Sequence, residues 1–420
     1  MVSKFFNMNL TILTQWFPPE HAPIGYMIKE LADELVSDGH DVTIITGFPN
    51  HPSGIVFGGY KKKWMQVEYI GSVRVIRVWL ATSPKRTRWR RLFTFITFTL
   101  TSAWALVRYT KVQLIFAVFQ PLSVGVTLPF LARMKGAKLI LNIQDLHPDV
   151  PIELGLVSNP VLIRALKMIE WVGYAKSDGL AVICDSFKTH CAARGGKDSA
   201  IDVIPNWIDL NEIKPENRNN NFRDKIGLNE SHFVVLYAGT IGWVSGANIM
   251  LDVACQLLEL SSIRIVFVGE GAMVPELKTE VATRKLTNVI FVPFQRRSIL
   301  SEVQSVSDVS VISLKPGKGK TSVPSKVLGY MAAARPIVAS VDSDSETASM
   351  IVQASCGRVV EPGNSVKFAE EICALQFDSD LRRKLGMNGR NYLEQHYAKG
   401  IITKKYIDFF KRVVKDKDAN

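Results

Sequence analysis

Cysteine is scarce in this chain, and its five cysteines follow no recognisable metal or disulfide pattern. No two of them form a Cys-x-x-Cys pair, and no histidine accompanies them at the spacing of zinc ligands. The sequence therefore supports neither a structural zinc site nor a disulfide framework. A reducing cytoplasm fits this cysteine usage best.

A dinucleotide-binding fingerprint is also missing. The turn Val268-Gly-Glu-Gly271 begins like the Gly-x-Gly-x-x-Gly motif, but Val274 stands where the third glycine belongs. The sequence Asp342-Ser-Asp344 is similar to a metal-binding motif of another transferase architecture. It follows a predicted strand late in the chain, where a solvated turn is the simpler interpretation. We therefore predict neither a dinucleotide cofactor nor a bound metal.

Acidic residues are fewer than basic ones, 39 against 51, and the formal net charge is +12. Such an excess suits nucleic acid, an anionic membrane or a phosphorylated ligand. Nucleic acid is not expected, because no helix-turn-helix, zinc finger or aromatic RNA-binding strand accompanies the basic residues. A secretory leader is not expected either, because Met8–Thr14 is typical of a short buried strand.

Short apolar runs alternate with helix-length segments along nearly the whole chain. Alternation of this kind predicts parallel sheets covered by helices on both faces. Helices are expected at Gly25–Ser37 and Leu162–Ala175. The candidate strands are Leu10–Thr14, Asp41–Thr46, Val73–Trp79, Leu114–Val118, Lys138–Ile143, Gly179–Ile183, Asp202–Ile204, Phe233–Ala238, Arg264–Val268, Val289–Val292, Val309–Ser313, Ile337–Ser340 and Gly357–Val360.

The polar stretch Asn211–Ser231 interrupts this alternation and is the best domain boundary. We predict an α/β protein of two doubly wound Rossmann-like domains, residues 1–210 and 211–397, that face each other across a cleft. A last helix within residues 398–420 has enough apolar spacing to pack, and it can return to the first domain. Ligands of such folds bind at the carboxyl ends of the strands.

One segment, residues 85–107, differs from the rest. The basic run Lys85–Arg91 is followed by Leu92–Val107, which contains no charge. A buried core helix, a helix lying in the headgroup plane of an anionic membrane, and a short spanning helix are all compatible with this pattern. We favour a peripheral membrane contact, because tryptophans and phenylalanines accompany the basic cluster.

Loops after the predicted strands of the first half supply candidate site residues. Gly25 stands at the start of a helix, where a ligand can approach backbone N–H groups closely. Asp145 and His147 follow the strand Lys138–Ile143 and are titratable groups for acid or base chemistry. The alternative for Asp145 is that it only caps a turn.

The second half offers loops suited to a phosphate. Tyr237-Ala-Gly-Thr-Ile-Gly242 and Val268-Gly-Glu-Gly271 are strands followed by glycine-rich turns, which aim backbone donors at an anion. Lys326, in a Pro-Ser-Lys turn before an apolar helix, is the cation best placed for a diphosphate, although it can also be only a solvated lysine. The predicted donor-binding residues are Gly239, Thr240, Gly242, Gly269, Gly271, Pro293, Ser325 and Lys326, beside Gly25 of the first half.

Together these motifs resemble the retaining glycosyltransferases of family 4, which have the GT-B fold. The resemblance runs from about Leu10 to the C-terminus, and its further marks are Leu31–Thr46, Ile204-Pro-Asn-Trp-Ile-Asp209 and Met331-Ala-Ala. It implies transfer of a sugar from a nucleoside-diphosphate donor. Within the family, IQDLHPD and VPSK look most like the subgroup of bacterial surface polysaccharide enzymes that includes colanic-acid fucosyltransferases.

Several family features are absent. The positions of a frequent Glu-x7-Glu pair hold Thr321 and Gly329, and those of a frequent Arg and Lys hold Thr240 and Ser245. A histidine common in the acceptor-side loop is replaced by Gln144, so its role falls to Asp145 or His147. Neutralisation of the diphosphate then depends mainly on Lys326 and backbone donors.

The resulting hypothesis is a metal-independent, cytoplasmic-face transferase without a cofactor. Its expected partners are a nucleotide-sugar donor, a polyprenyl-diphosphate-linked saccharide acceptor and the anionic inner face of the plasma membrane. The expected process is synthesis of O-antigen, capsule or exopolysaccharide with fucose or a related deoxy or amino sugar. Two alternatives are a GT-B sugar-nucleotide epimerase and a non-catalytic subunit of a polysaccharide assembly complex.

Overall fold

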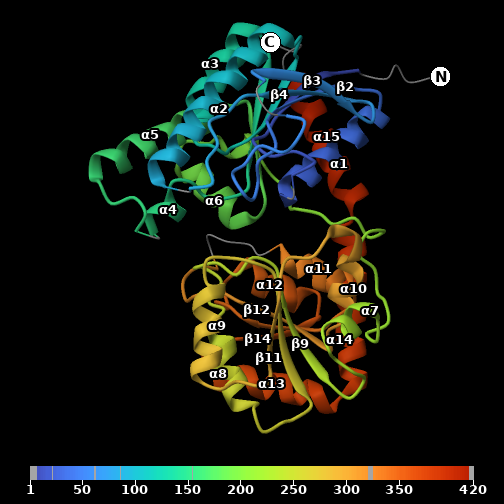
Figure 1. Ribbon diagram of the computed structural model, residues 1–420. Helices are drawn as coiled ribbons and strands as arrows, with labels where there is room; N and C mark the ends of the chain where they lie inside the picture. The colour runs from blue at the N-terminus through green and yellow to red at the C-terminus, as the bar shows by residue number, and fades with distance from the viewer. Residues whose placement is uncertain are drawn as a thin grey trace, which may run out of the picture. The chain divides into compact units, whose positions relative to one another are not determined.

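The computed structural model describes residues 7–20, 22–60, 63–85, 87–153, 155–319 and 325–415 (Figure 1). The chain forms two compact units. Unit 1 contains the chain up to Pro205 and again from Thr403 onward, and unit 2 is Asn206–Ile402. The structure thus divides the chain slightly before the boundary expected at residue 210.

Unit 1 is built on a sheet with the strand order β3-β4-β2-β1-β5-β6-β7-β8, in which only the β3–β4 pair is antiparallel. Its central strands are buried on both faces, as their continuous apolar sequences require. The strands are β1 (Asn9–Leu13), β2 (Asp41–Gly47), β3 (Met65–Ile70), β4 (Val73–Val78), β5 (Leu114–Val118), β6 (Lys138–Ile143), β7 (Gly179–Val182) and β8 (Ile201–Val203).

Strand β3 was not predicted from the sequence. It lies at the edge of the sheet, and no residue of it is fully buried. Its polar Gln66 and Glu68 interrupt the apolar run that marks a buried strand. The other strands of unit 1 lie within one residue of their expected limits.

Helices cover both faces of this sheet. Figure 1 shows α2, α3 and α5 on one face, with α1 and the C-terminal helix α15 (Lys399–Lys415) on the other. The helices are α1 (Pro23–Ser37), α2 (Arg88–Tyr109), α3 (Val124–Lys135), α4 (Asp149–Glu153), α5 (Pro160–Lys176), α6 (Asp185–Ala193) and the 3-10 turn η1 (Asp198–Ala200).

Helix α2 contains the segment for which the sequence left three interpretations. One side packs against β2, β4 and α3 and buries Phe98, Ala105 and Leu106 completely. The other side is exposed, and Leu100 retains 62% of its accessible surface. Within the described residues, α2 is the one helix long and apolar enough to cross a membrane by length and composition, and 39% of its most apolar window is buried.

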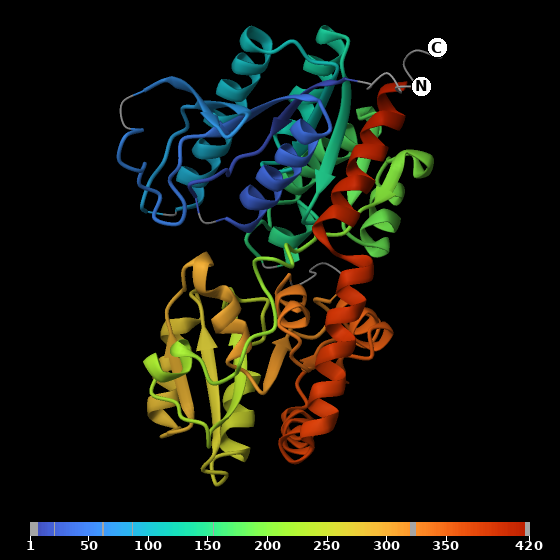
Figure 2. The same cartoon turned by 90° about the vertical axis from the view of Figure 1, so that its right-hand side faces the viewer.

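The C-terminal helix α15 (Lys399–Lys415) extends into unit 1. The Tyr406 hydroxyl is hydrogen-bonded to Asn142 of β6 at 2.8 Å, and the Phe410 ring packs on Phe116 of β5. A Cβ atom on Gly179 would lie 2.7 Å from the Phe409 ring, so the glycine makes room for that ring. Figure 2 shows this helix in red along the sheet of unit 1. Its apolar side therefore completes the core of unit 1.

Unit 2 contains a fully parallel sheet with the order β11-β10-β9-β12-β13-β14. One face packs on α8, α9 and α13, and the other packs on α7, α11 and α12. The strands are β9 (Phe233–Ala238), β10 (Ile263–Val268), β11 (Val289–Val292), β12 (Val309–Ser313), β13 (Ile337–Ser340) and β14 (Gly357–Val360). The helices are α7 (Asn221–Lys225), α8 (Ile249–Gln256), α9 (Val274–Thr283), η2 (Arg297–Ile299), α10 (Leu300–Ser305), α11 (Lys326–Ala332), α12 (Glu346–Gln353), α13 (Ser365–Phe377) and α14 (Ser379–His396).

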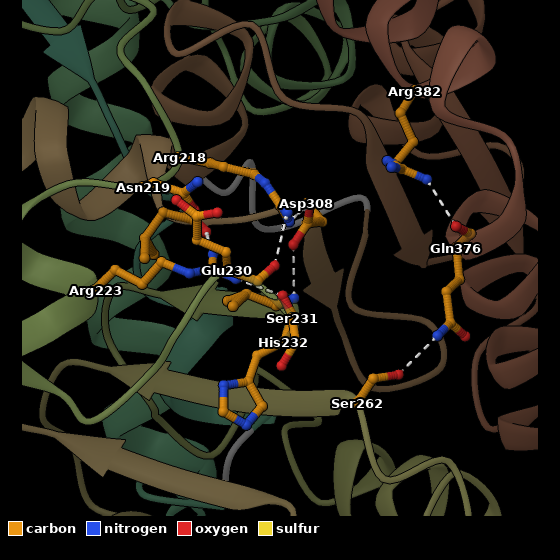
Figure 3. A network of polar contacts seen from close by, with 12 residues as sticks. Arg218, Asn219, Arg223, Glu230, Ser231, His232, Ser262, Asp308, Gln376 and Arg382 are labelled. Atoms are coloured by element: carbon orange, nitrogen blue, oxygen red, sulfur yellow. Dashed lines mark hydrogen bonds and ion pairs between the residues drawn. The ribbon is translucent and has the colours of Figure 1, made fainter.

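The polar stretch 211–231 belongs to unit 2 and is anchored at the amino edge of its sheet (Figure 3). Arg218 forms an ion pair with Asp308 at 2.6 Å, and Asp308 also accepts the backbone N–H of Val234. Arg223 is 1% exposed, and its guanidinium donates to the carbonyls of Asn229, Val306 and His232. The sequence predicted a domain boundary here because the stretch is polar, but its arginines form an ion pair and backbone hydrogen bonds within unit 2.

Candidate active site

The predicted donor loops of unit 2 meet at the carboxyl edge of its sheet. The backbone N–H of Gly239 donates to Val268, and that of Ile241 donates to Glu270, so the two glycine-rich turns continue the pairing of β9 with β10. A Cβ atom on Gly269 would collide with the Gly239 carbonyl, and its φ of 143° is rarely adopted by other residues. These glycines are needed for close contact between the loops, in addition to any ligand contact.

Lys326 is the first residue of α11, and its side chain reaches the end of β9. Its Nζ lies 3.6 Å from the centroid of the buried Tyr237 ring. A Cβ atom on Gly239 would lie 3.9 Å from the same nitrogen. Among the described residues, no carboxylate forms an ion pair with Lys326. Its charge is therefore held by a cation–π contact beside the glycine turn and is not neutralised.

Tyr330 holds this arrangement and was not singled out from the sequence. It stands one helical turn after Lys326, on the same side of α11. Its fully buried hydroxyl accepts the N–H of Ala238 at 2.8 Å and lies 3.3 Å from the Ala238 carbonyl oxygen. Burial raises the pKa of this phenol, so it remains neutral. The bond ties α11 to β9 next to the predicted site.

Two exposed aromatic residues stand at the same edge and were also missed. Trp243 follows the first glycine turn, and Phe294 follows Pro293 after β11. They retain 53% and 56% of their accessible surface. An exposed aromatic side chain next to a glycine-rich turn is suited to stacking with a planar base, and this exposure was not visible in the sequence.

Other residues of unit 2 that the sequence singled out lie in loops or outside the described residues. Ser325 is exposed just before α11. Asp342 accepts the backbone N–H groups of Gly317 and Gly319, so its carboxylate supports a loop. Thr321 and Pro324 lie outside the described residues. Within the described part of the chain, no group of three or more His, Cys, Asp or Glu side chains is placed to hold a metal ion.

The loop after β6 in unit 1 carries Asp145 and His147. Asp145 is exposed, whereas His147 is half-buried. Burial lowers the pKa of His147, and the nearby Arg91 acts in the same direction, while Asp145 partly opposes both. His147 is therefore a neutral imidazole at neutral pH, able to accept or donate a proton.

A hydrogen-bond chain reaches this loop from the C-terminal helix. Tyr406 of α15 is bonded to Asn142, and the Asn142 side-chain oxygen accepts from Gln144 at 2.8 Å. Gln144 stands where the family that the sequence resembles often has a histidine. The first residue of the predicted acceptor loop is thus positioned by a residue distant in sequence.

The first loop of unit 1 is organised by Glu20 as well as Gly25. A Cβ atom on Gly25 would lie 3.0 Å from the Trp16 carbonyl oxygen, so this glycine permits close packing of the loop. The buried Glu20 carboxylate accepts backbone N–H groups from Phe17, Asn50 and His51. Burial raises the pKa of Glu20, against the effect of these hydrogen bonds.

Each unit therefore presents its predicted residues at the carboxyl edge of its own sheet. Gly239, Gly269, Gly271, Pro293 and Lys326 follow neighbouring elements of unit 2. Gly25, Asp145 and His147 follow strands β1 and β6 of unit 1. Tyr330, Trp243, Phe294 and Tyr406 were found only from the structure.

Comparison with known proteins gives two family matches. The glycosyl transferase 4-like domain matches residues 24–207, and the group 1 glycosyl transferases match residues 218–392. WcaI of Escherichia coli (strain K12), named as a colanic acid biosynthesis glycosyl transferase, is 25% identical over 75% of this chain and 79% of its own. WbjE of Pseudomonas aeruginosa, named as a glycosyltransferase, is 25% identical over 68% of this chain and 71% of its own.

Solved structures share the fold at low sequence identity. Sucrose-phosphate synthase from Thermosynechococcus elongatus gives a TM-score of 0.77 at 16% identity and covers 97% of this chain and 99% of its own. HepE of Anabaena, solved in complex with UDP and glucose, gives a TM-score of 0.71 at 15% identity. The match covers 96% of this chain and 99% of the HepE chain. The fold is that of the GT-B glycosyltransferases.

The chain belongs to the glycosyltransferases of family 4, as its motifs predicted, and it is a transferase enzyme. A transferase is the first of the three functions that the sequence left open.

Proposed function

We propose that this glycosyltransferase moves a sugar from a nucleoside diphosphate to a polyprenyl-diphosphate-linked saccharide, with retention and without a metal ion. The process is synthesis of a bacterial surface polysaccharide such as an O-antigen, capsule or exopolysaccharide, at the cytoplasmic face of the membrane. The names of the relatives and the IQDLHPD and VPSK motifs support this assignment. The same motifs favour fucose or a related deoxy or amino sugar.

The observation that carries the proposal is the unneutralised Lys326 ammonium beside the glycine turns. When the bond between sugar and diphosphate breaks, negative charge accumulates on the leaving phosphate oxygens. A fixed cation there stabilises the transition state more than the bound substrate. The Tyr330 bond to Ala238 preorganises α11, so the lysine need not be ordered during the reaction.

Unit 1 supplies the acceptor side in this proposal. Asp145 is an exposed carboxylate, and His147 is a neutral imidazole on the same loop. Either can orient the acceptor hydroxyl and take up its proton. Their shared loop is fixed at its start by the Gln144–Asn142–Tyr406 chain.

Replacing Lys326 with Met tests the donor side. A thermal-shift panel of nucleotides and sugar nucleotides first identifies the donor, because a ligand that binds the folded state raises its stability. Turnover of that donor is then expected to fall roughly 10²-fold in Lys326→Met, the scale for loss of one oxyanion-stabilising group. Lys326→Arg, which keeps the charge, should retain more activity than Lys326→Met.

Lys278 provides a matched control. Its Nζ lies 5.7 Å from the centroid of Phe291, which stacks on Phe267, and Phe267 in turn packs against Tyr237. Lys278→Met should leave turnover close to that of the unaltered enzyme. Normal turnover in a folded Lys326→Met variant would remove the lysine from the mechanism.

A further inference from the structure

Three neighbouring helices of unit 1 expose apolar side chains along their outer sides. Helix α3 packs against both α2 and α5, so the three form one layer over the sheet (Figure 1). We call the side of this layer that points away from the sheet the three-helix face. It extends well beyond the segment 85–107 that the sequence marked.

The exposed residues repeat at helical spacing. On α2, Phe93, Ile96, Leu100 and Trp104 are three or four positions apart, and all are exposed. On α3, Val126, Phe130 and Met134 follow the same rule, and Phe130 is 66% exposed. A repeat of this kind normally faces a protein core, but here the core lies on the opposite side of each helix.

Helix α5 continues the face. Its exposed Val161, Met168 and Trp171 lie on one side of the helix, with Met168 60% exposed. Helices α3 and α5 approach closely because Gly125 and Gly173 meet over the Phe119 ring, where a Cβ atom on Gly173 would lie 3.3 Å from the Gly125 Cα. The two stripes are therefore neighbours on a firmly packed layer.

The exposed charged side chains of these three helices are all basic. Helices α2 and α3 contain no acidic residue, and the single acidic residue of α5, Glu170, is fully buried in contact with His190 and Arg194. Arg90, Arg108, Arg133 and Arg164 are all exposed on these helices. An apolar surface on helices that expose basic residues and no acidic ones complements an anionic bilayer, whose headgroups attract arginine and lysine.

The face also adjoins the predicted acceptor loop. Helix α2 follows β4, so it begins at the carboxyl edge of the sheet and runs back to the amino edge. There the Arg74 guanidinium of β4 donates a hydrogen bond to the Tyr109 carbonyl at the end of α2. Its first turn places Arg91 close enough to His147 to influence its protonation. A bilayer on the three-helix face would therefore lie beside the edge that carries Asp145 and His147.

We propose that the three-helix face, formed by α2, α3 and α5 together, is the surface through which unit 1 docks on an anionic lipid bilayer. This inference rests on the membrane location in the proposed function and specifies the surface responsible. It predicts that residues of α3 and α5, far from the basic run of the sequence, contribute to docking as much as α2 does.

Vesicle flotation of the full-length protein tests the inference with substitutions on two helices that the sequence did not mark. Phe130→Glu and Met168→Glu should each weaken binding to phosphatidylcholine vesicles containing phosphatidylglycerol by about tenfold, since each loses buried apolar area and adds a repelled charge. Phe377→Glu is the matched control, because Phe377 is 81% exposed on α13 of unit 2. Thermal melting and nucleotide binding of each variant show that it is folded.

The possible results separate the two hypotheses. If the unaltered protein does not float with anionic vesicles, the membrane location in the proposed function fails. If it floats, and Phe93→Glu on α2 abolishes binding while Phe130→Glu and Met168→Glu do not, the three-helix inference is overturned and the membrane location stands. A dimer that Phe130→Glu converts to a monomer, without a change in flotation, would identify the face as a contact between copies and also overturn the inference.

Discussion

Burial sets the chemistry of His147 at the scale of single residues. Its pKa is lowered from the ordinary value of 6.5, mainly because the charged imidazolium is desolvated. The unfolded chain therefore binds more protons than the folded chain as the pH falls below about 6.5. The contribution of His147 to stability is present in full above that pH and declines as the pH falls through the region.

A histidine NMR titration checks this directly. The His147 resonances, assigned by comparison with His147→Gln, should titrate with a midpoint below the ordinary histidine pKa of 6.5. Stability of His147→Gln should depend less on pH near pH 6 than that of the unaltered protein. A His147 midpoint at or above 6.5 would contradict the neutral imidazole assigned to the acceptor loop.

Residue type and local motif were enough to find Lys326, but not its partners. The Pro-Ser-Lys turn and the apolar helix after it are contiguous in sequence, so the cation could be predicted. Tyr330 contacts a backbone group of Ala238, 92 positions earlier in the chain. Nothing in the local pattern separates such a tyrosine from one that only fills a core.

At the scale of elements, α15 shows how a distant helix supports a loop. Tyr406→Phe removes the hydroxyl bonded to Asn142 and leaves a buried amide group without this partner. The free energy of unfolding of unit 1 should fall by about 1–3 kcal/mol, the usual cost of leaving a buried polar group without its partner. Denaturant titration followed by tryptophan fluorescence would measure the change.

A matched control is Tyr392→Phe, because the Tyr392 hydroxyl bonds Gln353 at an exposed position of unit 2. It should change stability little. If Tyr406→Phe is also neutral and acceptor kinetics are unchanged, the Tyr406–Asn142–Gln144 chain does not position the loop.

The strands were predicted better than the edges of the sheet. Buried parallel strands such as β5 and β9 have continuous apolar sequences, because helices cover both faces of the sheet. The edge strand β3 is half solvated, and its pairing with β4 depends on a partner rather than on its own composition.

At the scale of the whole molecule, the last segment of the chain completes unit 1. Tyr406, Phe409, Phe410, Val413 and Val414 are each at most 6% exposed. Fully burying a side chain of this kind contributes about 1.5–3 kcal/mol, so their combined loss approaches the whole stability of a domain. A chain that ends at Ile402 should therefore lose the folded state of unit 1 and keep that of unit 2.

Limited proteolysis with mass spectrometry distinguishes the two units. Fragments from unit 1 should appear rapidly in the shortened protein, while unit 2 stays resistant and is still protected by a nucleotide that binds the intact enzyme. A chain ending at Lys415 is the control. Equal resistance of unit 1 in the chain ending at Ile402 would show that α15 is not needed for its core.

The sequence by itself determined the two doubly wound units and the glycine and lysine loops of the second unit. These features depend on local periodicity, on turn residues and on motifs whose members are close in the chain. Only the tertiary structure decided that α15 completes unit 1, that Tyr330 fixes α11 and that three helices share one exposed apolar face. Each of these depends on which distant side chains meet and which remain in solvent, and that is fixed only when the sheets and helices pack.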